Sequence, residues 1–246
     1  RLVGSGDVYK RQFMYPYGYG YYFDPTYVLV IIAFLLTLFA SMGVKSTFSK
    51  YNDVRSSRGI TAASAARQIL DANGLQNIRV EHVSGDLTDH YSPNENVIRL
   101  SDSTYNSTSV AAIGVAAHEC GHAVQHQVGY VPIKIRNGIV PIVNVCNTLS
   151  MPIFIIGLIL GLGRLAMVGA ILFGGVRVFQ LVTLPTEINA SRRAMKTLES
   201  MYLLEGDELT GARKTLTAAA MTYVAAVAST ALQFLRLVLL ANRRRD

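Results

Sequence analysis

The sequence predicts an α-rich α+β integral membrane protein with a small sheet and three to four transmembrane helices. Half of the 246 residues are hydrophobic and only 16% are charged, whereas a soluble domain usually has roughly 25% charged residues. The mean hydropathy is +0.30. The apolar residues gather in long stretches, and a polar segment with strand-like alternation separates the first stretch from the rest.

The first apolar stretch, residues 27–43, contains no charged residue and is long enough to cross a bilayer. The basic residues from Lys45 to Arg58 follow this stretch. A signal peptide would have its basic residues in front, so a membrane helix is the better interpretation. Because positive charge favours the cytoplasmic side, residue 44 onward is expected in the cytoplasm.

The residues before this stretch form two short segments. Residues 1–12 lack a methionine and resemble a translated adaptor, so we expect residues 1–13 to be a non-native leader and Met14 to be the natural start. Residues 14–23 are rich in tyrosine, which favours the membrane–water interface.

The polar segment 44–105 predicts one helix and two strands. Residues 61–72 have the pattern of a short amphipathic helix that ends at Asn73-Gly74. Residues 78–83 and 96–100 have the pattern of strands. A longer, alanine-rich helix is expected over 107–127, with Ser107 or Thr108 as its N-cap.

Two further apolar stretches, 139–162 and 165–184, are expected to form a transmembrane hairpin. Pro141 and Pro152 lie inside the first limb, where neighbouring helices can satisfy the freed carbonyls. Pro185 is expected to end the second limb, so that a polar helix begins at Glu187.

The fourth stretch, 215–240, is rich in alanine, which suits close contact between membrane helices. A full span would put the arginines at 243–245 outside, against the positive-inside tendency. The sequence leaves open whether this stretch spans the membrane or packs on the catalytic domain.

Charge and cysteine content exclude several classes of protein. The net charge is +7, but the basic residues lie beside apolar stretches, so no nucleic-acid partner is expected. Cys120 and Cys146 suggest reduced thiols rather than a disulfide framework. Arg177 is the one ionisable residue in the middle of the first three stretches, which argues against a transporter.

The 107–127 helix contains the motif His118-Glu119-Cys120-Gly121-His122. Two histidines four residues apart lie on one helix face and can bind one zinc ion. Glu119 lies to the side, where it can accept a proton from a water on the metal. Because three protein ligands are usual in a catalytic zinc site, a third must lie downstream.

Glu187 is the preferred third ligand, because it follows the hairpin and returns to the side of His118. A carboxylate favoured at a helix N-terminus is the alternative interpretation of Glu187. Weaker ligand candidates are Glu199, Glu205 and His126, while His82 and His90 are expected at the surface.

The segments NVIRLSDSTYNSTSVAAIGVAAHECGHAVQH and LPTEINASRRA, on either side of a hairpin, resemble the YugP-like neutral zinc metallopeptidase family of bacterial membrane proteins. That family is similar to gluzincins such as the HtpX heat-shock peptidases and the CaaX prenyl proteases. Their motif E-x-x-A-D matches Glu187 as the ligand, but Ser191 stands where they have aspartate. Asn189, Ser191 or Arg192 could take over its supporting role.

The resemblance also implies an edge strand along the cleft at residues 96–100, with Asn96, Val97 and Ile98 beside a peptide substrate. It implies a multi-pass protein of the bacterial inner membrane with one Zn²⁺ and a site on the cytoplasmic side.

We therefore expect a gluzincin-like zinc endopeptidase that acts on peptides or membrane proteins in contact with the lipid bilayer. A non-catalytic scaffold or chaperone partner that retains a metal site is the alternative. The expected segments are the leader 1–13, the interface segment and first transmembrane helix 14–43, a first catalytic segment 44–138, the transmembrane hairpin 139–184, a second catalytic segment 187–214, and a membrane or membrane-packed helix with a basic tail 215–246.

Overall fold

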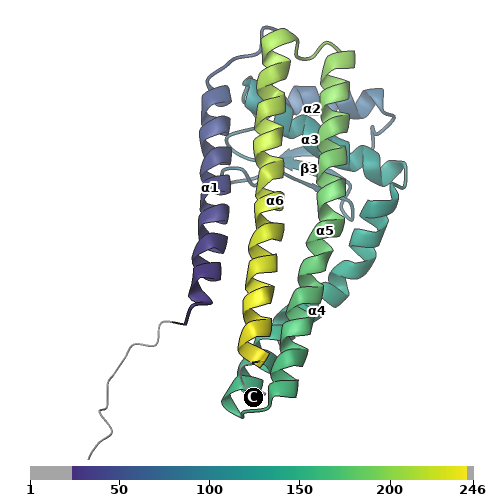
Figure 1. The fold of residues 1–246 in the computed structure, drawn as a ribbon. Coiled ribbons are helices and arrows are strands. Elements are labelled where there is room, and N and C mark those ends of the chain that lie inside the picture. Colours follow the sequence, from purple (N-terminus) through teal and green to yellow (C-terminus); the bar gives the residue numbers. More distant parts are fainter. Residues whose placement is uncertain (1–23, 243–246) are drawn as a thin grey trace, which may run out of the picture.

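The computed structural model describes residues 24–242 (Figure 1). The expected leader 1–13, the tyrosine-rich residues 14–23, the terminal arginines and the side chain of Arg177 lie outside the described residues. The elements follow in the order α1 (Tyr27–Asn52), α2 (Ala62–Ala72), β1 (Arg79–His82), β2 (His90–Ser92), β3 (Val97–Leu100), α3 (Val110–Gln127), α4 (Val131–Ile159), α5 (Gly163–Ser200) and α6 (Gly206–Asn242).

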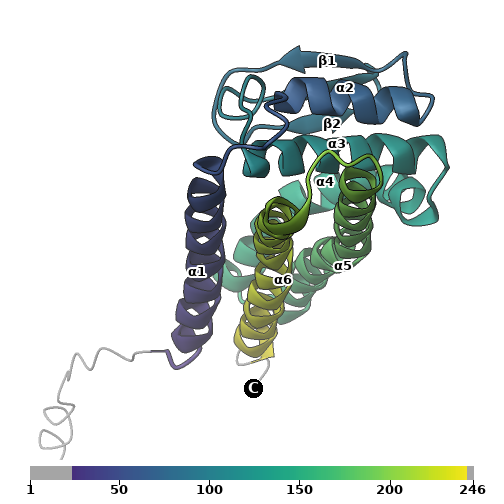
Figure 2. The same cartoon turned by 90° about the horizontal axis from the view of Figure 1, so that it is seen from above.

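The molecule has a bundle of long helices with a smaller α/β region at one end. Figures 1 and 2 show α1, α4, α5 and α6 extending away from the sheet and α2, with α3 lying between the bundle and the sheet. Three helices are long and apolar enough to cross a membrane, namely Tyr27–Asn52, Val131–Ile159 and Gly206–Leu240. Gly163–Val176 is a shorter apolar helix. The predicted fold class, an α-rich membrane protein with a small sheet, is confirmed.

Helices α4 and α5 form the expected hairpin, and glycines allow their backbones to touch. A Cβ atom added at Gly169 would lie 2.5 Å from the backbone nitrogen of Phe154, and one at Gly157 would overlap the backbone of Ala166. Such close approach lets membrane helices gain dispersion energy where lipid supplies no hydrophobic drive.

One expected boundary is wrong, because Pro185 does not end the second limb. Helix α5 continues through Pro185 from Gly163 to Ser200. A proline removes one backbone hydrogen bond, but packing against neighbouring helices can offset that loss. Here α3, α4 and α6 all pack on α5. Glu187 therefore lies within a long helix instead of at the start of a new one.

Helix α6 lies beside α1 and extends toward the same end of the molecule as the start of α1 and the turn of the hairpin (Figure 1). Near that end, the guanidinium of Arg236 lies 4.6 Å from the ring centroid of Tyr27, in a cation–π contact. The fourth apolar stretch is thus a full-length bundle helix in contact with α1, α3 and α5.

The sheet has the strand order β1-β3-β2, so the expected position of residues 96–100 at an edge is wrong. Strand β3 pairs in parallel with β1 and antiparallel with β2. Its central place explains why Val97 and Ile98 are fully buried. Sequence analysis did not predict β2, since three residues beside a turn are too short to show alternation. The free edge nearest α3 belongs to β2.

Helix α3 begins at Val110, and its N-cap is Ser109 rather than Ser107 or Thr108. The Ser109 hydroxyl accepts a hydrogen bond from the Ala112 amide (3.1 Å) and donates one to Asn52 Oδ1 (2.9 Å). One side chain therefore caps α3 and ties it to the end of α1. The alanine-rich helix α3 packs against α2 and also against α5 and α6. These contacts bury most of the helix.

Candidate metal centre

The two histidines of α3 and one carboxylate of α5 meet at one point. The rings of His118 and His122 lie edge to face with centroids 4.7 Å apart. Oε2 of Glu187 lies 3.2 Å from Nε2 of His118 and 3.3 Å from Nε2 of His122. All candidate ligand atoms of this trio lie within 4.8 Å of one another. Among the described residues, this is the one group of His, Cys, Asp and Glu found with such spacing.

Gly121 brings the two helices close enough for this meeting. A Cβ atom at position 121 would lie 2.6 Å from the backbone oxygen of Ala190. Only a residue without a side chain therefore permits the observed contact between α3 and α5. Glu187 lies one turn before Ala190, so the contact sets how near its carboxylate comes to the imidazoles.

Each imidazole has a hydrogen-bond partner on its other nitrogen. Nδ1 of His118 lies 3.0 Å from the Ser191 hydroxyl, and Nδ1 of His122 lies 3.1 Å from Oε1 of Gln125. The Gln125 amide nitrogen donates to the Thr186 carbonyl (2.8 Å), which turns Oε1 toward His122. Nδ1 of His122 therefore donates to Gln125, and its Nε2 is the atom that faces Oε2 of Glu187.

This arrangement fits a divalent cation. Two imidazole nitrogens and a carboxylate oxygen point at a common centre, and the donor set is one that zinc accepts. Burial alone would raise the pKa of Glu187, but hydrogen bonds from the two histidines hold that pKa well below its usual range. Burial would lower the pKa of His122, yet contacts with Glu187 and Glu119 raise it overall. The carboxylate is thus ionised, as a ligand must be.

Glu119 is buried and lies outside the trio. It lines a cavity of about 240 Å³ together with His118, Glu187 and Tyr223. The apolar side of this cavity comes from α1, α3 and α6. Glu119 therefore faces the space in front of the candidate ligands, where a substrate and a water could enter.

Three residues at the site were missed by sequence analysis. Arg136 of α4 places Nη1 3.7 Å from Oε1 of Glu187, and Tyr223 of α6 also hydrogen-bonds this carboxylate. Gln125 orients His122. A signal existed for two of them: Gln125 lies three residues after His122 on one helix face, and Arg136 is a charged residue just before an apolar stretch. Tyr223 gave no signal.

The three residues that could support a ligand, Asn189, Ser191 and Arg192, lie in different places. Ser191 contacts His118, and Asn189 accepts hydrogen bonds from Gln125 (2.9 Å) and Arg193 (2.8 Å). Arg192 is exposed. Ser191 therefore occupies the position beside the ligand that the resemblance assigns to aspartate, while Asn189 acts one step further out through Gln125.

The other sequence candidates lie away from the trio. His126 is exposed and packs near Tyr91, with ring centroids 6.2 Å apart. His82 and His90 are exposed, as are Glu199 and Glu205. The thiol of Cys120 is buried against the Ala66 carbonyl (3.6 Å), which explains its role as a packing residue. Asn96 precedes the central strand β3 instead of an edge.

Three candidate membrane spans and a trio of candidate metal ligands are the arrangement expected of a membrane metallopeptidase. Residues 26–242 match the family model described as "Putative neutral zinc metallopeptidase". The chain belongs to this family.

A particular relative is the "Putative membrane protease YugP" of Bacillus subtilis (strain 168), which is 44% identical over 218 residues. The match covers 89% of this chain and 97% of the relative. No solved structure matches the chain.

Proposed function

We propose that the protein is a zinc-dependent endopeptidase in which His118, His122 and Glu187 hold the metal and Glu119 is the general base. The observation behind this proposal is the convergence of two Nε2 atoms and one carboxylate oxygen beside a second, unligated carboxylate. The donor set favours zinc over other divalent ions. The family and the membrane protease relative support a peptidase of this kind.

A zinc ion at this place would polarise a substrate carbonyl and lower the pKa of a water toward about 7. Glu119 accepts the proton of the attacking water and passes it to the leaving amine. Arg136 lies beside Oε1 of Glu187 and Tyr223 hydrogen-bonds the same carboxylate, while Oε2 faces the imidazoles and is left for the metal. Ser191 and Gln125 fix the two imidazole rings in the orientation needed.

The proposed substrate is a peptide or a segment of a membrane protein. Its main chain would add to the outer edge of β2, because both edges of β3 are already paired. Leu87 and Asp89, just before β2, line the same cavity as Glu119, so a strand on this edge would pass in front of the site.

The catalytic site is proposed to face the cytoplasm, with residues 44–138 and 187–214 forming one catalytic domain. Lys45, Lys50 and Arg55 follow the first membrane helix, and positive charge is retained on the cytoplasmic side. Helix α4 then runs outward through the membrane and α5 runs back, so Glu187 lies on the same side as His118.

The test compares Glu119→Gln with His118→Ala in the full-length protein in nanodiscs. Glu119→Gln is expected to keep stoichiometric zinc and to lose at least about 100-fold in casein hydrolysis, because only the base is removed. His118→Ala is expected to lose both zinc and hydrolysis. Exposed Glu199→Gln is the matched control and should behave as the wild type. Full activity of Glu119→Gln would contradict the mechanism, and zinc without hydrolysis in the wild type would favour a scaffold.

A further inference from the structure

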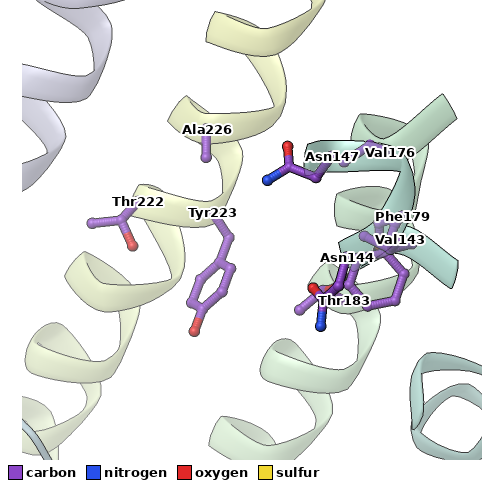
Figure 3. Close-up of a pocket in the computed structure, with 9 residues that line it drawn as sticks. All are labelled: Val143, Asn144, Asn147, Val176, Phe179, Thr183, Thr222, Tyr223 and Ala226. Atoms are coloured by element: carbon purple, nitrogen blue, oxygen red, sulfur yellow. Dashed lines mark hydrogen bonds between the residues drawn. The ribbon is translucent and has the colours of Figure 1, made fainter. Parts of the chain in front are cut away.

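A second cavity lies between α4, α5 and α6 (Figure 3). Its volume is about 470 Å³. Helix α5 forms its floor, and α4 and α6 form its walls. We call this cavity the bundle groove. It shares one residue, Tyr223, with the cavity that contains Glu119, so the two spaces adjoin at that ring.

The groove leads to the candidate metal centre along all three helices. On α5, Val176 and Thr183 of the groove lie on the same helix face as Glu187, at intervals of seven and four residues. On α4, Asn147 lies eleven residues after Arg136, also on one face. Since Arg136 and Tyr223 both interact with Glu187, the three faces converge there.

The lining is polar without being charged. Asn144 and Asn147 project from α4, Thr183 from α5 and Thr222 from α6. Figure 3 shows the carboxamide of Asn147 directed across the groove toward Ala226, and the ring of Tyr223 directed into it from α6. Asn144 and Asn147 are exposed, and among the described side chains neither carboxamide has a hydrogen-bond partner, although α4 is a candidate membrane span. A carboxamide that opens onto such a groove without a partner is costly in a bilayer and marks a functional position.

We propose that the bundle groove binds an extended, uncharged segment of a membrane-protein substrate and leads it from the bilayer to the metal centre. This inference rests on the proposed peptidase function. A carboxamide both donates and accepts hydrogen bonds, as a peptide group does, so Asn144 and Asn147 match the main chain of an unwound span. A lipid acyl chain would leave both amides unsatisfied.

The length of the groove and its approach to Glu187 suit a short extended segment. From Val176 to Glu187 helix α5 rises about 16 Å at 1.5 Å per residue, which an extended peptide covers in about five residues at 3.3 Å each. The proposed occupant is an unwound membrane segment, one that contains helix-breaking residues near its cleavage point.

Binding is tested independently of catalysis, in the Glu119→Gln, Cys146→Ser protein. A bimane label is attached at Ala226→Cys inside the groove, or at exposed Val224→Cys on the outer face of α6 as the matched control. Buried Cys120 stays unlabelled. The probes are a synthetic Leu/Ala membrane peptide with a Gly-Pro break near one end, the same peptide without the break, and vesicles of phosphatidylcholines with different chain lengths.

The broken peptide is expected to give a saturable change of fluorescence at Ala226→Cys. The unbroken peptide should bind at least fivefold more weakly there, and neither peptide should change the fluorescence at Val224→Cys. Asn144→Leu with Asn147→Leu should remove it, while Asn137→Leu, the same change outside the groove, should not. Equal binding of the unbroken peptide, saturation by lipid chain length alone, or no response to the broken peptide would overturn the proposal.

A second measurement separates this proposal from the peptidase function. In the otherwise native protein, the double leucine variant should cleave the broken membrane peptide about tenfold more slowly and hydrolyse casein at the unchanged rate. Equal slowing of both would point to a damaged site and would contradict the groove. If the wild type hydrolyses neither, the peptidase proposal fails, and the fluorescence result still decides what the groove binds.

Discussion

At the scale of single residues, Ser191 contacts the candidate ligand His118 at the position where the resemblance implies an aspartate. Its hydroxyl oxygen lies 3.0 Å from Nδ1 of His118 and can accept a hydrogen bond from the imidazole N–H. Without this partner the ring loses orientation, and loss of such a support usually weakens metal binding about 10–100-fold. Ser191→Ala should therefore weaken zinc affinity by this factor, as measured by competition with a chelator. Ser191→Asp should keep affinity at or above the wild-type value, and Ser200→Ala, on the exposed end of α5, should leave it unchanged.

Gly121 sets the distance between the two ligand-bearing helices. A methyl group here would overlap the Ala190 carbonyl, so Gly121→Ala must push α5 away from α3. We expect this variant to insert in the membrane but to lose most of its bound zinc, measured by metal analysis of the purified protein. Gly175→Ala on α5 meets open space and is the control, with zinc retained. Full zinc occupancy in Gly121→Ala would show that the helix contact does not fix the site.

At the scale of elements, the cap of α3 links the helix of the two candidate histidine ligands to α1, a candidate membrane span. Ser109→Ala removes the hydrogen bonds to the Ala112 amide and to Asn52 together. Loss of an N-cap costs about 1 kcal/mol, and loss of the second hydrogen bond adds to this figure. The expected result is a lower midpoint of thermal unfolding in detergent, with Ser107→Ala giving a smaller decrease. An unchanged midpoint would contradict the role of this cap.

The elements also show what sequence could and could not predict. Helical spacing located α3, and the apolar runs located α1, the hairpin and α6, because burial in lipid demands long uninterrupted patterns. His118 and Glu187 are 69 residues apart, and the expected return of the hairpin, supported by resemblance to a known motif, selected that carboxylate, because periodicity does not reach so far. The prediction that a helix ends at Pro185 was wrong, because packing against neighbouring helices keeps α5 continuous through the proline. Strand β2 was too short to detect, and with it the true edge of the sheet was missed.

At the scale of the whole molecule, the helix bundle determines which helix ends lie on the same side of the membrane. The start of α1, the end of α6 and the hairpin turn lie at the end opposite the sheet (Figure 1). With the catalytic domain in the cytoplasm, all three should be outside. In intact bacterial cells, an impermeant maleimide should label Asn242→Cys, introduced into the Cys146→Ser protein, without permeabilisation. It should label exposed Glu199→Cys only after permeabilisation. The reverse pattern would place the site on the outer face.

The two halves of the candidate site are joined only through the α4–α5 hairpin. During synthesis His118 and Glu119 emerge well before Glu187, and the carboxylate reaches them only once α5 has folded back against α3. On the proposed function, a copy that fails to fold its hairpin would lack the third metal ligand and should therefore be inactive as a peptidase.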